Sequence, residues 1–189
     1  MVSARPRSVT FVSRNAGKVP ETRETLRPYG VTLRWRRKEF IEPQAARLEE
    51  VVRAKLHEVE GWAGYVLVED SGFFIPSLNG FPGVYSAHVL EAWGFTPILE
   101  LLRSRPREAY FRTVAGLRRG RSEWLFVGEV RGTVARRPAG HGGFGYDPIF
   151  LPRGWKRTFA EATPEEKNGI SHRARAMRKV GKFLVGRPT

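Results

Sequence analysis

An apolar strand that runs directly into two acidic residues constrains the fold of this chain more than any other feature. Residues 65–68 (YVLV) are apolar and rich in β-branched side chains, as in a buried strand. Glu69 and Asp70 follow at once, and Ser71 and Gly72 favour a turn after them. Successive side chains of a strand point to opposite faces of its sheet. We therefore expect two carboxylates at the end of a buried strand, pointing in opposite directions.

The rest of the chain alternates between strand and helix signals. Apolar residues recur at helical spacing between residues 45 and 61, and Gly and Pro residues mark turns between residues 76 and 83. The predicted order is a strand at 8–13, a loop and helix at 15–30, a strand at 31–35, a helix at 45–61, the strand at 65–68, a helix at 89–103, a hairpin of 109–117 with 122–134, and a final helix from Ser171. This order predicts a single α/β domain over residues 1–189, with a mixed sheet.

Composition narrows the function classes. The formal net charge of +14 favours a phosphate-bearing partner, namely a nucleotide, a nucleic acid or a membrane surface, although a solvated basic face explains it equally well. The chain has no cysteine, which excludes disulfides, thiol catalysis and cysteine-bound zinc. No apolar run approaches the roughly 18 residues that a membrane span needs. The basic N-terminal stretch lacks the apolar centre of a signal peptide, so we expect a cytoplasmic protein.

Residues 13–18 (SRNAGK) connect the first strand to the first helix. A helix N-terminus offers unpaired N–H groups and the positive end of the helix dipole, and Ser13, Asn15 and Lys18 can add donors to it. The spacing differs from that of a Walker loop. The segment is therefore consistent with an ordinary capped helix as well as with a phosphate-binding loop.

Asp70 has two possible roles. It can cap a turn through Ser71 and Gly72, as aspartate often does. Alternatively, it is a metal ligand, because open α/β sheets bind their ligands at the ends of strands. Magnesium prefers carboxylate oxygens and usually arrives together with substrate phosphates. Both interpretations remain open on these residues alone.

Two further segments combine aromatic, acidic and basic residues. Phe144 and Tyr146 in residues 143–148 (GFGYDP) lie two positions apart, with Asp147 beside them. The rings can pack in the core, or they can stack on a purine whose edge the aspartate contacts. His172 and Arg173 open a basic helix, which fits an ordinary surface helix as well as a binding site.

Taken together and in this order, these segments closely resemble the Ham1-like family of inosine triphosphate pyrophosphatases. The shared motifs extend over almost the whole chain and are SRNAGK (13–18), VEDSGFF (68–74), LNGFPGVYS (78–86), GFGYDPIF (143–150), TFAE (158–161) and EEKNGISHR (165–173). The family hydrolyses non-standard purine nucleoside triphosphates to the monophosphate and pyrophosphate. The resemblance implies an elongated mixed β-sheet flanked by helices, two lobes with a deep nucleotide-binding cleft between them, and a homodimer.

The resemblance also implies roles for single residues. Asp70 would be the catalytic residue and a ligand of Mg²⁺, for which Mn²⁺ is a possible substitute, and Glu39 would be the second acid near the metal. Glu69 is expected to face the other way and to matter less. The implied substrate-binding residues are Ser13, Arg14, Asn15, Ala16, Gly17 and Lys18 in the phosphate-binding loop, Ser71, the purine-stacking Phe144 and Tyr146 with Gly145 between them, and Asp147, Lys167, His172 and Arg173, which read the purine edge or help to seat the nucleotide.

The chain departs from the family pattern at three places. Arg14 stands where the family often has glycine. Ala87 and His88 follow the GVYS motif, where a lysine or arginine is frequent, so a phosphate contact there passes to His88 or is lost. A family lysine on the second helix matches either Arg53 or Lys55.

The sequence thus predicts an enzyme that removes inosine, deoxyinosine or xanthosine triphosphate from the nucleotide pool. It does not say which of these three is preferred. One alternative is a basic nucleic-acid-binding protein, which would use the positive surface but leave Asp70 without a role. Another is a pyrophosphatase that acts on other modified nucleotides.

Overall fold

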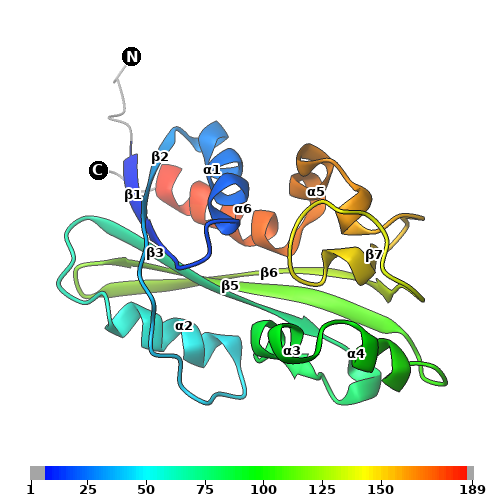
Figure 1. The fold of residues 1–189 in the computed structure, drawn as a ribbon. Coiled ribbons are helices and arrows are strands. Elements are labelled where there is room, and N and C mark those ends of the chain that lie inside the picture. Colours follow the sequence, from blue (N-terminus) through cyan, green and yellow to red (C-terminus); the bar gives the residue numbers. More distant parts are fainter. Residues whose placement is uncertain (1–6, 187–189) are drawn as a thin grey trace.

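A seven-stranded mixed β-sheet runs through the computed structural model, which describes residues 7–186 (Figure 1). Its strands are β1 (Arg7–Val12), β2 (Val31–Arg36), β3 (Tyr65–Phe74), β4 (Pro82–Gly83), β5 (Glu108–Arg119), β6 (Ser122–Val134) and β7 (Phe150–Pro152). The strand order is β2-β1-β3-β5-β6-β7, and β4 pairs with β3 outside this path. β1 is parallel to β2 and β3, whereas the other neighbours are antiparallel. The predicted mixed sheet is confirmed.

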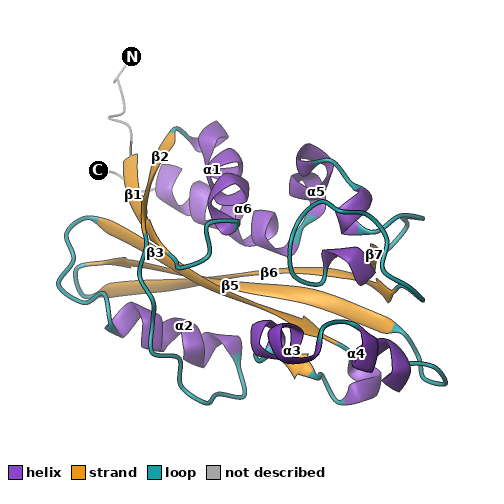
Figure 2. Cartoon of the chain, viewed as in Figure 1, coloured by secondary structure: helices purple, strands orange, loops and turns teal. Residues whose placement is uncertain are grey.

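Helices cover both faces of this sheet (Figure 2). One face carries α1 (Lys18–Leu26), α5 (Pro164–Ile170) and α6 (His172–Val185), and the other carries α2 (Leu48–His57), α3 (Ser86–Trp93) and α4 (Thr96–Leu101). Short 3₁₀ turns lie at Arg27–Tyr29, Pro76–Leu78, Asp147–Ile149 and Phe159–Glu161. Between residues 7 and 186, no helix is long and apolar enough to cross a membrane.

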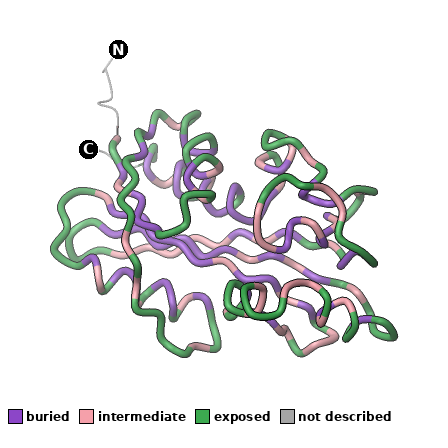
Figure 3. The backbone as a smooth tube through the Cα atoms, viewed as in Figure 1, coloured by how far each residue is buried: buried purple, intermediate pink, exposed green. Residues whose placement is uncertain are grey.

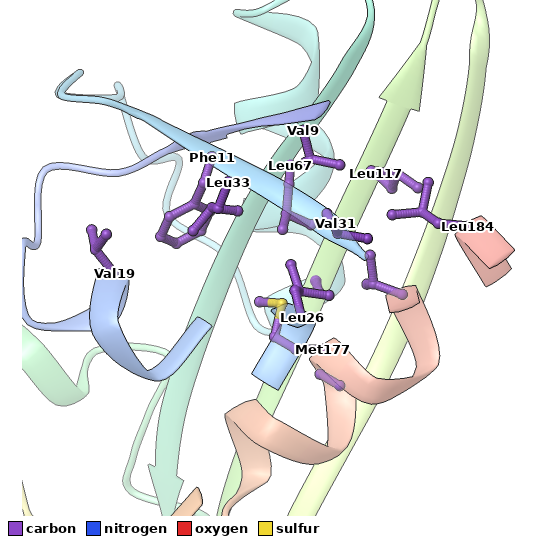
Figure 4. Packing of buried hydrophobic residues seen from close by; sticks show 13 residues of the cluster. Val9, Phe11, Val19, Leu26, Val31, Leu33, Leu67, Leu117, Met177 and Leu184 are labelled. Atoms are coloured by element: carbon purple, nitrogen blue, oxygen red, sulfur yellow. The ribbon is translucent and has the colours of Figure 1, made fainter. Parts of the chain in front are cut away.

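The two ends of the molecule have different hydrophobic cores, which together comprise three clusters of buried apolar side chains. At the β1 end, one cluster packs between the sheet and helices α1 and α6 (Figure 4), and a second packs under α2 on the opposite face. The third surrounds Phe73 and Phe111 at the other end and includes residues of α4 and β7. Buried residues follow the middle of the sheet from one end to the other (Figure 3). β3 and β5 therefore connect two lobes with separate cores.

β3 is longer than predicted. The sequence placed the end of this strand before Glu69 and Asp70, but the strand continues to Phe74. Its pairing with β1 stops at Leu67, whereas β5 pairs with it as far as Phe74. The prediction of a strand end was wrong because this long-range pairing keeps Ser71 extended. The two acids lie in mid-strand, at the level where β1 has ended.

The helix predicted for residues 89–103 is also different, because it consists of α3 and α4. Gly94 separates them with a φ of 66°, a left-handed conformation that favours glycine. The helix predicted for residues 45–61 is shorter and begins at Leu48. There the Glu50 carboxylate accepts the N–H groups of Ala46 and Arg47 and so caps the first turn.

A glycine allows α6 to approach β6 closely. A Cβ atom at Gly128 would collide with the carbonyl oxygen of His172 and the amide nitrogen of Ala176. The first turn of α6, which carries His172 and Arg173, can therefore lie against the sheet only because residue 128 has no side chain. This packing sets the position of two of the predicted site residues.

We expect Gly128→Ala to lower the free energy of unfolding by about 1–3 kcal/mol, because the helix must shift to make room. Chemical denaturation measures this change. The matched control is Gly169→Ala in α5, where an added Cβ would meet nothing within 4 Å. That variant should be as stable as the parent or slightly more stable, because alanine favours helix. Equal stability of the two variants would contradict the close-packing account.

Candidate active site

A cleft of about 820 Å³ lies between the two lobes. The loop after β1, the middle of β3, the start of α3 and the first turn of α6 all contribute to its lining. Every predicted binding residue except Ala16 and Gly17 lines this cleft, and so do Glu39 and Asp70. Segments that are far apart in the sequence therefore meet in one place.

The loop after β1 is held by its own side chains. Ser13 Oγ accepts the N–H of Asn15 at 3.1 Å, and Asn15 Oδ1 accepts the N–H of Gly17 at 2.9 Å. Ala16 and Gly17 turn the chain into α1, which begins at Lys18. The Ser13 hydroxyl and the Asn15 amide group keep their hydrogens for a ligand, since the loop uses only their acceptor oxygens.

Glu69 has a larger part in the site than expected. Its Oε1 lies 2.6 Å from Lys18 Nζ, and its Oε2 accepts a hydrogen bond of 2.8 Å from Ser71. Burial would raise the pKa of this carboxyl, but the charges of Lys18 and Arg173 outweigh burial and lower it. Glu69 does point to the face opposite Asp70, yet it lines the cleft and fixes Lys18. The expectation that Glu69 matters less is not supported.

Asp70 is paired with Lys55 of α2, which lies on the other face of the sheet from α1 and Lys18. Lys55 Nζ lies 2.7 Å from Asp70 Oδ1 and 2.8 Å from Glu42 Oε1. Burial raises the pKa of Asp70, although Lys55 acts against this rise. Burial disfavours the charged form of Lys55, but the two carboxylates raise its pKa overall. Of the two candidates for the family lysine, the structure brings Lys55 into the cleft, whereas Arg53 lies near Glu123 and outside the cleft lining.

The structure places Glu42, and not Glu39, beside Asp70. The side chain of Glu39 is 76% exposed and pairs with Arg14 at 2.8 Å. Glu42 reaches Asp70 through the shared Lys55 ammonium. Within the described residues, no group of three acidic or histidine side chains could hold a metal ion by itself. Two carboxylates suit Mg²⁺, however, because this ion usually takes its remaining oxygens from substrate phosphates and water.

The two aromatic residues predicted to sandwich a purine have different surroundings. Tyr146 is 2% exposed, stacks on Phe73 at 4.8 Å, and donates its hydroxyl to the carbonyl oxygen of Ser86. Phe144 is only partly buried, with Lys167 Nζ 4.7 Å from its ring centroid. Phe144 is thus the more accessible ring of the two in the cleft, whereas Tyr146 is packed into the cleft wall.

Asp147 makes its hydrogen bonds within the protein. One carboxylate oxygen accepts the N–H of Phe144 at 2.8 Å and the ammonium of Lys167 at 2.6 Å. Burial raises the pKa of Asp147, and Lys167 opposes this rise. Through these two hydrogen bonds, Asp147 fixes the turn at Phe144 and the position of the Lys167 ammonium.

Glu21 is a residue that the sequence analysis missed. It accepts hydrogen bonds from Lys167 at 2.7 Å and from Arg173 at 2.5 Å. Burial would raise the pKa of Glu21, but these two cations lower it. Glu21 lies three residues after Lys18, on the same side of α1, and this spacing was the signal available.

His172 and Arg173 carry buried polar atoms that lack partners. The His172 ring stacks on Phe111 at 4.6 Å, and burial lowers its pKa well below the usual value, so that it is neutral at pH 7. Its Nδ1, like Arg173 Nε, has no hydrogen-bond partner among the described residues. Buried polar atoms are nearly always paired in native proteins. Because both residues line the cleft, these atoms point to a polar ligand.

Comparisons with known proteins agree with this geometry. The family model of the Ham1 family matches residues 9–183. A protein of Thermococcus kodakarensis called dITP/XTP pyrophosphatase is 44% identical over 178 residues, covering 93% of this chain and 96% of its own. A protein of the same name from Methanopyrus kandleri is 42% identical, with 93% and 95% covered.

Solved structures are similar over the same extent. The structure of a HAM1 protein from Coxiella burnetii superposes with a TM-score of 0.82 at 30% identity, covering 96% of this chain and all of the other. A dITP/XTP pyrophosphatase from Mycobacterium abscessus gives a TM-score of 0.70 at 33% identity, with 94% of this chain covered. The match over nearly the full length, in sequence and in fold, shows that the chain belongs to the Ham1 family.

Proposed function

We propose that this chain hydrolyses non-standard purine nucleoside triphosphates, those of inosine, deoxyinosine and xanthosine, to the monophosphate and pyrophosphate. Residues 1–189 would act as one domain. The observation that carries this proposal is the Asp70–Lys55 pair, which lies in the same cleft as a donor-rich loop and a set of unpartnered polar atoms. The names of the relatives at about 40% identity support the same substrates.

The cleft offers separate surroundings for the two ends of a nucleotide. The loop of residues 13–18 and Lys18 provide donors and positive charge for phosphates. Phe144, His172 and Arg173 provide an aromatic face and donors for a base. This arrangement supports the predicted set of binding residues. Within that set, Tyr146 and Asp147 hold neighbouring parts of the cleft wall in place. His88, exposed at the start of α3, also lines the cleft and is available for a phosphate contact when protonated.

Asp70 is the residue we assign to catalysis. A water molecule that attacks the α-phosphorus must be held in line with the bond that breaks, and the Asp70 carboxylate, which lines the cleft, can orient it by accepting a hydrogen bond. Lys55 holds this carboxylate in place. Lys18 can offset the charge that develops on the departing pyrophosphate.

A divalent cation fits the acids of the cleft. We propose that Asp70 and Glu42 hold Mg²⁺, with Mn²⁺ as a substitute, and that Glu39 is at most an outer neighbour. When bound, such an ion neutralises phosphate charge and makes water more acidic. The remaining parts of the proposal are a homodimer, which the resemblance to the family implies, and a cytoplasmic location, which fits an enzyme that acts on the nucleotide pool. A role in nucleic-acid binding would leave the buried carboxylates of the cleft unexplained.

We expect Asp70→Asn to lower turnover of inosine triphosphate by about a hundredfold or more, because it removes the carboxylate that orients the attacking water and holds the cation. Released pyrophosphate measures turnover, and thermal unfolding checks that the variant is folded. A folded variant with nearly full activity would refute the assignment of Asp70.

Metal dependence distinguishes the two candidate second ligands. Excess chelator should abolish activity. Glu42→Gln should raise the Mg²⁺ concentration needed for half-maximal activity by about tenfold or more, the scale for perturbing a metal site. Glu39→Gln serves as the comparison and should raise it far less. A larger effect at Glu39 would restore the ligand set implied by the family resemblance.

Base selectivity tests the role of Arg173. Its free donor suits the carbonyl at carbon 6 of hypoxanthine or xanthine, whereas adenine presents an amino group there and leaves donors unpaired. Arg173→Ala should therefore reduce inosine triphosphate hydrolysis much more than the residual hydrolysis of adenosine triphosphate. Arg157→Ala is the control, since Arg157 pairs with Glu166 and does not line the cleft. An equal loss on both nucleotides would mean that Arg173 holds phosphate or supports the structure, and that its role in reading the base is wrong.

A further inference from the structure

Thr113 on β5 contacts the site from beneath. It lies directly opposite Ser71 of β3 in the antiparallel register, and the two hydroxyl oxygens are 2.6 Å apart. Thr113 is 0% exposed and is not among the residues that line the cleft. Ser71, which does line the cleft, is the residue through which its hydroxyl is connected to the site.

The hydrogen bonds around Ser71 determine which hydroxyl donates. A serine hydroxyl has one hydrogen and two acceptor lone pairs. Ser71 gives its hydrogen to Glu69 Oε2 at 2.8 Å. The short contact with Thr113 must then be donated by Thr113, and the second lone pair accepts from Arg173 Nη2 at 3.3 Å. Every hydrogen-bonding position of Ser71 is thus occupied.

Ser71 is the point at which the two ends of the site meet. Through Glu69 it is linked to Lys18, on the side that we assign to the phosphates. Through Arg173 it is linked to Glu21, on the side that we assign to the base. If Thr113 did not donate, one acceptor position of Ser71 would be empty and its hydroxyl could rotate away from Glu69.

We propose that Thr113 is a positioning residue. By donating to Ser71, it keeps the Ser71 hydroxyl directed at Glu69 and so holds Lys18 and Arg173 in place for the substrate. This inference rests on the proposed function. A threonine that only packs between strands would act through its methyl group, which valine also has.

Two substitutions separate the hydroxyl from packing. Thr113→Val keeps the shape but removes the donor, and it should lower kcat/KM for inosine triphosphate about threefold to tenfold, the scale of one hydrogen bond. The preference for inosine over adenosine triphosphate should fall as well. Thr113→Ser restores the donor and should stay within about twofold of the parent. Thr25→Val is the control, because its buried hydroxyl donates to the Glu21 backbone carbonyl oxygen of its own helix and not to a side chain of the site.

A double-mutant cycle with Ser71→Ala tests whether Thr113 acts through Ser71. We expect Thr113→Val to have little further effect once the serine hydroxyl is gone. An equal loss in both backgrounds, or no loss in either, would overturn the proposal. Binding of inosine monophosphate in chelator, measured by calorimetry on the same four proteins, should show the same dependence. If the parent protein did not hydrolyse inosine triphosphate, the proposed function would be contradicted. The double-mutant cycle measured by calorimetry would still decide the role of Thr113.

Discussion

Two neighbouring carboxylates in a buried strand are the constraint on which the rest of the structure depends. Glu69 and Asp70 point to opposite faces of β3, and each pairs with a lysine from the helix layer on its side, Lys18 from α1 and Lys55 from α2. Removing one partner of such a buried pair typically costs about 3–5 kcal/mol, because the remaining charge has no compensation. The contacts that fasten both helix layers to β3 are therefore the same contacts that form the site.

Local patterns predicted most of the fold, and long-range pairing explains what they missed. The strand before Glu69, the β5–β6 hairpin and the final helix have clear apolar periodicity, and all three are present in the structure. Ser71 and Gly72 look like a turn, but their pairing with β5 keeps them in the strand. Glycine at residue 72 is required there for another reason, since a Cβ would come within 2.7 Å of the Phe74 ring.

The sequence predicted most of the residues of the site, but not the ion pairs and hydrogen bonds between them. Motifs identified Asp70, Lys167 and Arg173, and the cleft contains all three. The three-residue spacing puts Glu21 on the same side of α1 as Lys18, but it does not identify Lys167, 146 positions away, as its partner. No sequence pattern linked Glu42 to Asp70, and the structure connects the two through Lys55, which contacts both. Residues whose role is to hold another side chain have no motif of their own.

The positive charge of the chain does not accumulate unpaired in the cleft. Lys18, Lys55, Lys167 and Arg173 each have a carboxylate partner there. In the proposed binding mode, an incoming triphosphate competes with Glu69 for Lys18, so the net charge of the chain contributes little at that point. In the proposed binding mode, selectivity depends on Arg173 Nε and His172 Nδ1, two buried atoms of cleft residues that have no hydrogen-bond partner within residues 7–186, because a ligand that pairs them offsets their desolvation. A base with a donor at that position leaves these protein atoms unpaired and adds the desolvation of its own amino group, which weakens its binding.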